Sequence, residues 1–227
     1  MTYKIPIFLF LFAYNLNAYQ LAPYEAKYKF ESKEITITGI REFKKDQDNY
    51  EIRFEASNLF ASLFFSSKFI INDDMVQSKT YDVKIRPRFL KKDQSITFDR
   101  QQGFIKSSGH TSWDFKIDDS DLLLDPLNVQ IMIRIFIKNG INEFDLNIID
   151  MENGGSKTYT YTVTSNEKCA VSKTEYNCII LERYRIDSDR VVKYYLAKEL
   201  DFMFIKIIDS SPDKINKLEL KEVLSFG

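Results

Sequence analysis

The 227-residue sequence is poor in residues on which many enzymes depend. It has one histidine, two cysteines and one tryptophan, with only seven glycines and five prolines. A catalytic triad needs a histidine beside its nucleophile, and a closed zinc site needs about four ligands. The sequence also has no Gly-x-Ser-x-Gly elbow, no phosphate-binding glycine loop and no dinucleotide fingerprint. We therefore expect no catalytic residue, no metal and no cofactor.

The sequence also has no excess of positive or negative charge. The chain has 32 basic and 33 acidic residues, which gives a net charge of −1. Its overall charge does not attract a polyanion, so we expect no nucleic-acid partner. Apolar residues make up 44% and charged residues 29% of the chain, which is typical of a folded soluble protein.

The sequence has no apolar run of about 20 residues, the length that a membrane-spanning helix needs. Its apolar residues 5–14 follow Lys4 and end at Asn15-Leu16-Asn17-Ala18. A basic start, a short hydrophobic middle and a small residue before the cut are typical of a signal peptide. We expect cleavage after Ala18 and a periplasmic or secreted mature chain without a transmembrane segment. An uncleaved anchor is the alternative, which the short run disfavours.

Aromatic residues are abundant, with 19 Phe and 13 Tyr, and many lie in segments that alternate apolar and polar residues. Strict alternation is typical of antiparallel strands with one buried face. We expect a mainly β fold, with an antiparallel curved sheet or partly open barrel and one central helix, in a single domain over residues 19–227. The expected strands include residues 24–31, 50–56, 75–86, 93–99, 144–148, 159–163, 177–186, 190–197, 203–209 and 216–224.

The central helix is predicted between Asp125 and Gly140. Asp is a favoured helix cap, Pro126 suits the first helical position, and a glycine commonly follows the last turn. Apolar residues also alternate over 127–137, so a strand is the competing interpretation, but the caps and the length favour a helix. Two other segments are predicted to be irregular: residues 58–71, a short helix or an apolar loop leading into a strand, and residues 100–112, a loop.

The two cysteines, Cys169 and Cys178, have eight residues between them, and their flanks look like the two strands of a hairpin. Exported proteins meet oxidising conditions, in which such a pair can close a disulfide. We expect this disulfide, and two unpaired thiols are the alternative.

His110 and a cluster of aspartates are the polar candidates for a site. His110 lies alone in a polar segment without a nucleophile, and we interpret it as solvated. Asp118, Asp119, Asp121 and Asp125 lack the glycine turn and the closing Glu of a calcium loop. We expect a solvated loop with Asp125 as the helix cap. Paired carboxylates acting on a cell-wall glycan remain an alternative function.

A basic patch lies around Pro87 and consists of Lys84, Arg86, Arg88, Lys91 and Lys92. Such a patch suits anionic lipid headgroups or cell-wall polymers. The simpler interpretation is the solvated face of a strand and a turn.

Large apolar side chains are most crowded in residues 58–71, and the candidate ligand-binding residues are Phe60, Phe64, Phe65 and Phe69. Ordinary core is the simpler interpretation, because large apolar residues are usually buried. The alternative is a groove for an acyl chain or an apolar partner surface. The leading hypothesis is therefore a non-catalytic envelope protein that binds a lipid or a hydrophobic partner protein. The glycan-acting enzyme and a purely structural interaction module are the other hypotheses, and the oligomeric state is left open.

Several segments, taken in their order along the chain, can be compared with known protein families. They are residues 21–28, 50–56, 125–127, 138–140, 167–185, 194–197 and 202–207. Over residues 20–222 this order resembles the DUF3108 family, bacterial proteins of unknown function. The resemblance implies an exported β-rich domain and no assigned catalytic residues.

Overall fold

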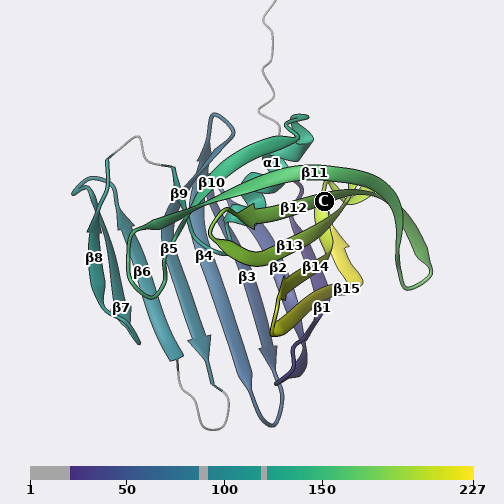
Figure 1. Ribbon diagram of the computed structural model, residues 1–227, viewed down its shortest axis with the longest axis horizontal. Helices are drawn as coiled ribbons and strands as arrows, with labels where there is room; N and C mark the ends of the chain where they lie inside the picture. The colour runs from purple at the N-terminus through teal and green to yellow at the C-terminus, as the bar shows by residue number, and fades with distance from the viewer. Residues whose placement is uncertain (1–20, 87–91, 119–121) are drawn as a thin grey trace, which may run out of the picture.

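One continuous β-sheet makes up most of the molecule (Figure 1). The computed structural model describes residues 21–86, 92–118 and 122–227, so the predicted signal segment 1–18 lies outside the described residues. The predicted mainly β fold, with a curved sheet and a central helix, is confirmed. The strands are β1 (Tyr24–Glu31), β2 (Thr36–Asp46), β3 (Asn49–Ser57), β4 (Ser62–Asn72), β5 (Met75–Ile85), β6 (Lys92–Asp99), β7 (Phe104–Gly109), β8 (Trp113–Lys116), β9 (Leu123–Leu124), β10 (Glu143–Ile149), β11 (Ser156–Val171), β12 (Thr174–Arg185), β13 (Ser188–Ala197), β14 (Met203–Ser211) and β15 (Lys214–Phe226).

Two meanders build the sheet and meet at its centre. The strand order is β8-β7-β6-β5-β4-β3-β2-β1-β15-β14-β13-β12-β11-β10-β9. Strands β1 and β15 come from opposite ends of the described chain, and they pair from Tyr24 with Phe226 to Glu31 with Lys217. The short contact of β9 with β10 is parallel, while the ladders within each meander are antiparallel. The sheet therefore depends on one pairing of high sequence separation.

The sheet is not closed into a barrel, because its outer strands β8 and β9 do not pair with each other. Side chains join its margins instead. The Ser78 hydroxyl on β5 donates to the Leu123 carbonyl of β9 at 3.0 Å, and Trp113 Nε1 on β8 donates to the Met151 carbonyl at 3.2 Å. A Cβ at Gly154, where φ is +76°, would lie 3.1 Å from the Trp113 ring, so this contact requires glycine.

The helix α1 (Val129–Lys138) lies between the two meanders (Figure 1). Asp125 Oδ1 accepts the backbone N–H groups of Leu127 and Asn128 at 2.8 Å, so Asp125 caps the turn that leads into the helix. Gly140 follows the helix with φ +77°, the left-handed position that favours glycine. The predicted helix is confirmed, and the competing strand interpretation is wrong. The helix begins later than predicted, because its N-cap is Asn128 and its first residue is Val129, so the predicted placement of Asp125 as the helix cap and of Pro126 at the first helical position is wrong.

The sequence of α1 alternates like a strand because the helix is buried on nearly every side. Seven of its ten residues are buried, six of them apolar and one an arginine. A helix that packs against neighbours all round needs no polar face. Within the described residues, no helix combines the length and the apolar composition needed to span a bilayer.

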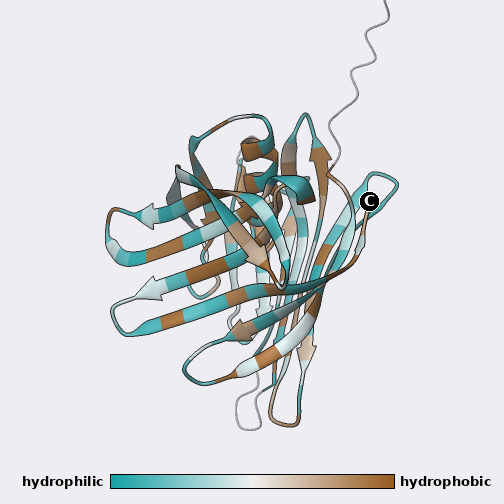
Figure 2. Cartoon of the chain, turned by 90° about the vertical axis from the view of Figure 1, so that its right-hand side faces the viewer, coloured by the Kyte–Doolittle hydropathy of each residue, from teal (hydrophilic) through white to brown (hydrophobic). Residues whose placement is uncertain are grey.

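Apolar side chains turn inward from both meanders and meet around α1. Along the strands, hydrophobic and hydrophilic residues alternate (Figure 2), as on β3, where Tyr50, Ile52, Phe54 and Ala56 are buried. The long strands of the first meander and the strands of the second cross one another as two layers (Figures 1 and 2). The two layers enclose the apolar core of the molecule.

Two segments predicted to be irregular are strands. β4 includes most of residues 58–71, so the short-helix interpretation is wrong and only residues 58–61 form a loop. β7 lies within residues 100–112, so the loop prediction there is also wrong. Ser107, a buried residue of β7, accepts a hydrogen bond from Gln94 Nε2 at 2.9 Å. The buried positions of β7 are Ile105 and Ser107, so a polar residue interrupts the apolar–polar alternation that would have predicted a strand.

Candidate ligand-binding pocket

A partly open pocket of about 360 Å³ lies between the start of α1 and the sheet. This volume is at the lower end of the range for small-molecule sites, about 300–1,000 Å³. Both meanders line the pocket, which is mostly apolar. The apolar lining includes Phe54, Leu63, Phe65 and Ile85 from the first meander, Ile207 and Leu218 from the second, and Leu127 beside α1.

Strand alternation explains why these side chains face the pocket. Phe54 on β3 and Phe65 on β4 are cross-strand partners, and their ring centroids lie 6.4 Å apart. Leu63 on β4 is likewise the partner of Ile85 on β5. Cross-strand pairs of this kind hold neighbouring strands in register. The apolar wall is therefore fixed by the same ladder that forms the sheet.

Arg41 on β2 is a buried cation in this lining, with only 1% of its surface exposed. Its Nη2 donates to Gln130 Oε1 of α1 at 2.7 Å, and its guanidinium lies 5.8 Å from the centre of the Tyr28 ring. Its Nε has no hydrogen-bond partner among the described residues. No carboxylate in the described part of the chain forms an ion pair with Arg41. A cation thus lies at the buried side of the pocket.

A second buried arginine, Arg134 of α1, has a different environment. Its Nε and Nη2 donate to the Asp201 carbonyl at 3.2 and 3.0 Å, and the Asp201 carboxylate lies 3.8 Å away. Lys138 donates to the same carboxylate at 2.5 Å. The guanidinium lies over the rings of Tyr24 and Phe43, at 5.4 and 5.6 Å. Only its Nη1 is buried without a partner, and burial lowers the pKa of Arg134.

A buried carboxyl group, that of Asp125, lies between β4 and α1. The Ser67 hydroxyl donates to Asp125 Oδ2 at 2.6 Å. Burial raises the pKa of Asp125 to about 7, although hydrogen bonds from Ser67 and from the backbone of Asn128 and Leu127 lower it. Burial also raises the pKa of the nearby Tyr81. These partners belong to the chain itself, so Asp125 serves the structure of the turn.

Comparisons with known proteins place the chain in a family and describe its fold. The model of the DUF3108 family, described as a protein of unknown function, matches residues 19–220. The chain belongs to this family.

A solved structure supports the fold of this DUF3108 chain. It is the crystal structure of a β-barrel-like protein of the domain of unknown function DUF1849 from Brucella abortus, with a TM-score of 0.61 and 11% sequence identity. The match covers 90% of this chain and 98% of that chain. At this identity the likeness shows the fold alone. The search of curated proteins found no match.

In the DUF3108 chain, the four phenylalanines that the sequence suggested lie in different places. Phe65 lines the pocket. Phe69, on the same strand, is fully buried and stacks on Phe43 and Tyr50 near Arg134. Phe64 lies on the other face of β4, with Lys84 Nζ 5.5 Å from its ring centre, and Phe60 is 65% exposed in the loop before β4. The structure therefore brings one of the four to the pocket.

Sequence reasoning did not single out Arg41 or Gln130. A signal for Arg41 was present, because the buried residues of β2 are Ile37, Gly39, Arg41 and Phe43, at every second position. An arginine in phase with buried residues is unusual, since charged side chains are rarely buried without a partner. Gln130 carries no comparable signal, because its role depends on where α1 packs.

The polar candidates lie elsewhere. His110 is exposed in the turn after β7 and lines a different, more polar pocket with Glu152 and Asn153. Asp118 is exposed, whereas Asp125 is buried, and Asp119 and Asp121 lie outside the described residues. No group of three or more His, Cys, Asp or Glu side chains in the described ranges is placed to hold a metal ion.

The described members of the basic patch are also engaged locally. Arg86 forms a two-pronged pair with Asp93, at 2.9 and 3.2 Å. Lys84 lies over the Phe64 ring. Arg88 and Lys91 lie outside the described residues. Lys92 on β6 is instead the cross-strand partner of the pocket residue Ile85, and it lines the more polar pocket that contains His110.

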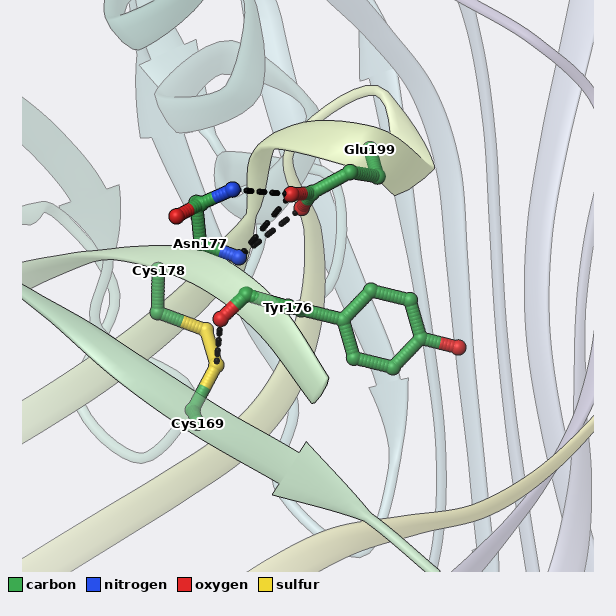
Figure 3. The surroundings of a disulfide bond; sticks show 5 residues. All are labelled: Cys169, Tyr176, Asn177, Cys178 and Glu199. Atoms are coloured by element: carbon green, nitrogen blue, oxygen red, sulfur yellow. Dashed lines mark hydrogen bonds between the residues drawn. A yellow bond between two sulfur atoms is a disulfide. The ribbon is translucent and has the colours of Figure 1, made fainter. Parts of the chain in front are cut away.

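The predicted disulfide between Cys169 and Cys178 is confirmed, with a Cα–Cα distance of 6.0 Å (Figure 3). It links β11 to β12 near the tip of their hairpin, where Cys169 pairs with Tyr176. The neighbouring Asn177 donates from its backbone N–H to Glu199 at 3.0 Å. This bond ties the hairpin to the 3-10 turn after β13, and a disulfide is typical of an oxidising compartment.

Proposed function

We propose that this protein is an exported, non-catalytic binding protein that holds a lipid-like apolar ligand in the pocket between α1 and the two meanders. The observation that carries the proposal is the mostly apolar pocket itself, lined from both halves of the sheet. Ligand sites in proteins are typically concave and apolar, with a few polar groups that fix orientation. The apolar lining and the buried Arg41 fit that description.

Ligand retention is the first test. Native mass spectrometry of the protein purified from the cell envelope is expected to show co-purifying lipid, and the delipidated protein is expected to bind a fluorescent fatty acid. A clean apo mass together with no binding of the probe would contradict the proposal.

A matched pair of variants locates the binding. Leu63→Trp places a larger side chain in the pocket lining, and we expect it to weaken binding of the fluorescent fatty acid by about 10-fold or more, since it removes the space for an acyl chain. Leu59→Trp makes the same change in the adjoining loop, where Leu59 is 91% exposed, and it should leave binding unchanged. Equal binding by both variants would place the ligand elsewhere.

Export is a separate part of the proposal. It is supported by the pattern of residues 1–18 and by the disulfide. The mature chain is proposed to start at Tyr19 and to fold as one domain. N-terminal sequencing of the protein from a periplasmic or secreted fraction should give Tyr19 first, and an intact Met1 in the cytosol would contradict this.

A further inference from the structure

The lining of the pocket contains a charge without a counter-charge. Arg41 is 1% exposed, its Nε has no hydrogen-bond partner among the described residues, and its contacts are the neutral Gln130 and Tyr28. From this we infer that the ligand is a single-chain amphiphile with an anionic head, and that Arg41 binds this head at the buried side of the pocket. The inference rests on the proposed function and adds the chemistry of the ligand.

A buried guanidinium without an anion is costly, because it gives up its hydration and receives little in return. Proteins normally pair such a group with a carboxylate or place it where an anionic ligand will bind. Arg134 shows the first solution, because Asp201 lies beside it. Arg41 shows the second, because it lines a pocket and forms no ion pair with a carboxylate of the described residues.

The acidic residue in the pocket lining, Asp209, and the acidic partner of the lining residue Lys217 are engaged by other cations. Asp209 lines the pocket but accepts Arg190 Nε at 2.6 Å. Lys217 also lines the pocket, and its Nζ lies 2.6 Å from Glu219, the residue two positions along β15. Neither carboxylate forms an ion pair with Arg41, so an anionic ligand can take that place.

A further polar atom in the lining lacks a partner. Asn216 Oδ1 is buried and has no hydrogen-bond partner in the described structure. It is an acceptor, so it can take a hydrogen bond from a hydroxyl or amide near the head of a ligand. Together, Arg41 and Asn216 provide a donor and an acceptor inside a largely apolar pocket. A volume of about 360 Å³ suits one acyl chain better than two.

Four twelve-carbon probes that differ only in the head test the inference. Isothermal titration of the delipidated mature protein would measure binding of dodecanoate, dodecyl phosphate, dodecanol and dodecyltrimethylammonium. A charge-assisted hydrogen bond to Arg41 should make at least one anion bind about 10- to 100-fold more tightly than dodecanol. The cation should bind most weakly. Preference for dodecanoate or for dodecyl phosphate identifies the head as a carboxylate or a phosphate ester.

Arg41→Met removes the charge and keeps much of the length of the side chain. We expect this variant to bind dodecanol as the wild type does and to lose the preference for the anions. Arg53→Met is the matched control, because Arg53 lies on the adjacent strand β3 and pairs with Glu42 outside the pocket. It should keep the preference. If Arg41→Met does not fold, Gln130→Leu, which removes the hydrogen bond that orients Arg41, should reduce the preference several-fold.

The outcomes separate this inference from the proposed function. Equal binding of dodecanoate, dodecyl phosphate and dodecanol by the wild type would overturn the role of Arg41 and leave an apolar pocket. A preference for anions that persists in Arg41→Met would overturn it as well. Failure of all four probes to bind would overturn the proposed function.

Discussion

The two buried arginines lie near each other in one interior, but their surroundings differ. We call the side around Arg134 the closed end of this interior, and the side around Arg41, which lines the pocket, its open end. At the closed end, Arg134 is bound by the carbonyl and carboxylate of Asp201 and covered by aromatic rings. At the open end, Arg41 has one side-chain hydrogen bond, to Gln130, and lies beside a pocket. The chain thus supplies a carboxylate partner to Arg134 and none to Arg41 among the described residues.

This difference shows how a binding site can be recognised from the unequal surroundings of two like residues. A buried ion pair such as Arg134 with Asp201 contributes to the native state only when both partners are present. A buried charge that lacks a partner is kept at a cost in stability, and proteins tolerate such a cost most readily where function needs it. Mutations at the closed end are therefore expected to lower the free energy of unfolding, and mutations at the open end to weaken ligand binding.

The largest contrast is expected between two phenylalanines of one strand. Phe69→Ala empties a fully buried position in the ring stack with Phe43 and Tyr50, and it should lower the free energy of unfolding by about 3–5 kcal/mol. Phe65→Ala, at the pocket, should cost only about 1–2 kcal/mol, because that side chain is half-buried beside existing space. Urea unfolding measures the first effect, and binding of the fluorescent fatty acid should fail in the second variant alone.

The charge network of the closed end should have the next largest effect. Asp201→Asn keeps a residue that tolerates the positive φ of 51°, but it leaves Arg134 and Lys138 without their carboxylate. Because breaking a buried pair leaves an unpaired buried charge, we expect a loss of about 3 kcal/mol. Glu222→Gln is the control, since its pair with Lys27 is exposed and should change stability by less than about 0.5 kcal/mol. Similar losses in both variants, measured by chemical denaturation, would remove the distinction between the ends.

A pH effect from Asp125 should be slightly smaller. Its pKa is raised to about 7 by burial, whereas an unfolded Asp titrates near 3.9. The raised pKa favours the protonated native state, so this contribution is full below about pH 4 and is lost as pH rises to about 7. Between pH 5 and pH 8 the free energy of unfolding should fall by about 2–3 kcal/mol from this group.

Two variants isolate the Asp125 contribution. Asp125→Asn should remove this part of the pH dependence, while Asp213→Asn, in an exposed turn, should retain it. Urea unfolding at pH 5 and pH 8 checks both, and an unchanged slope in Asp125→Asn would show that another group titrates.

The smallest effect is expected from the disulfide, which belongs to neither end. The double variant Cys169→Ala/Cys178→Ala should lower stability by about 2 kcal/mol, because the bridge closes a short loop. Binding of the fluorescent fatty acid should be unchanged, since neither cysteine lines the pocket. Thermal unfolding and a binding titration on the same sample measure both. Loss of binding in a folded double variant would connect the hairpin to the pocket.

Much of the fold could be predicted because its signals are local. Alternation on strands such as β3 and β10 reflects one buried face. Asp125 forms the turn that leads into the helix, and Gly140 follows its last turn. The disulfide followed from two cysteines flanked by strand patterns. β7 could not be predicted, because Ser107 is buried through hydrogen bonds rather than through apolarity.

The pocket could not be predicted, because it depends on contacts between distant parts of the chain. Phe65 and Ile207 line the same space only because the second meander folds over the first. The sequence also could not distinguish Phe64 from Phe65, since the face that each occupies depends on strand register. Arg41 had a detectable pattern, but its missing counter-charge became visible only when its neighbours were placed.

The pairing of β1 with β15 has a consequence for the order of folding. The ladder at the centre of the sheet joins residues 24–31 to residues 217–226, so it cannot form until nearly the whole described chain is present. The hairpins within each meander can form earlier, because their strands are neighbours in the sequence. Contacts of long sequence separation slow folding, and here one such contact unites the two halves. The complete sheet therefore forms only after β15 is available. Until then, β1 can pair with β2 but not with β15.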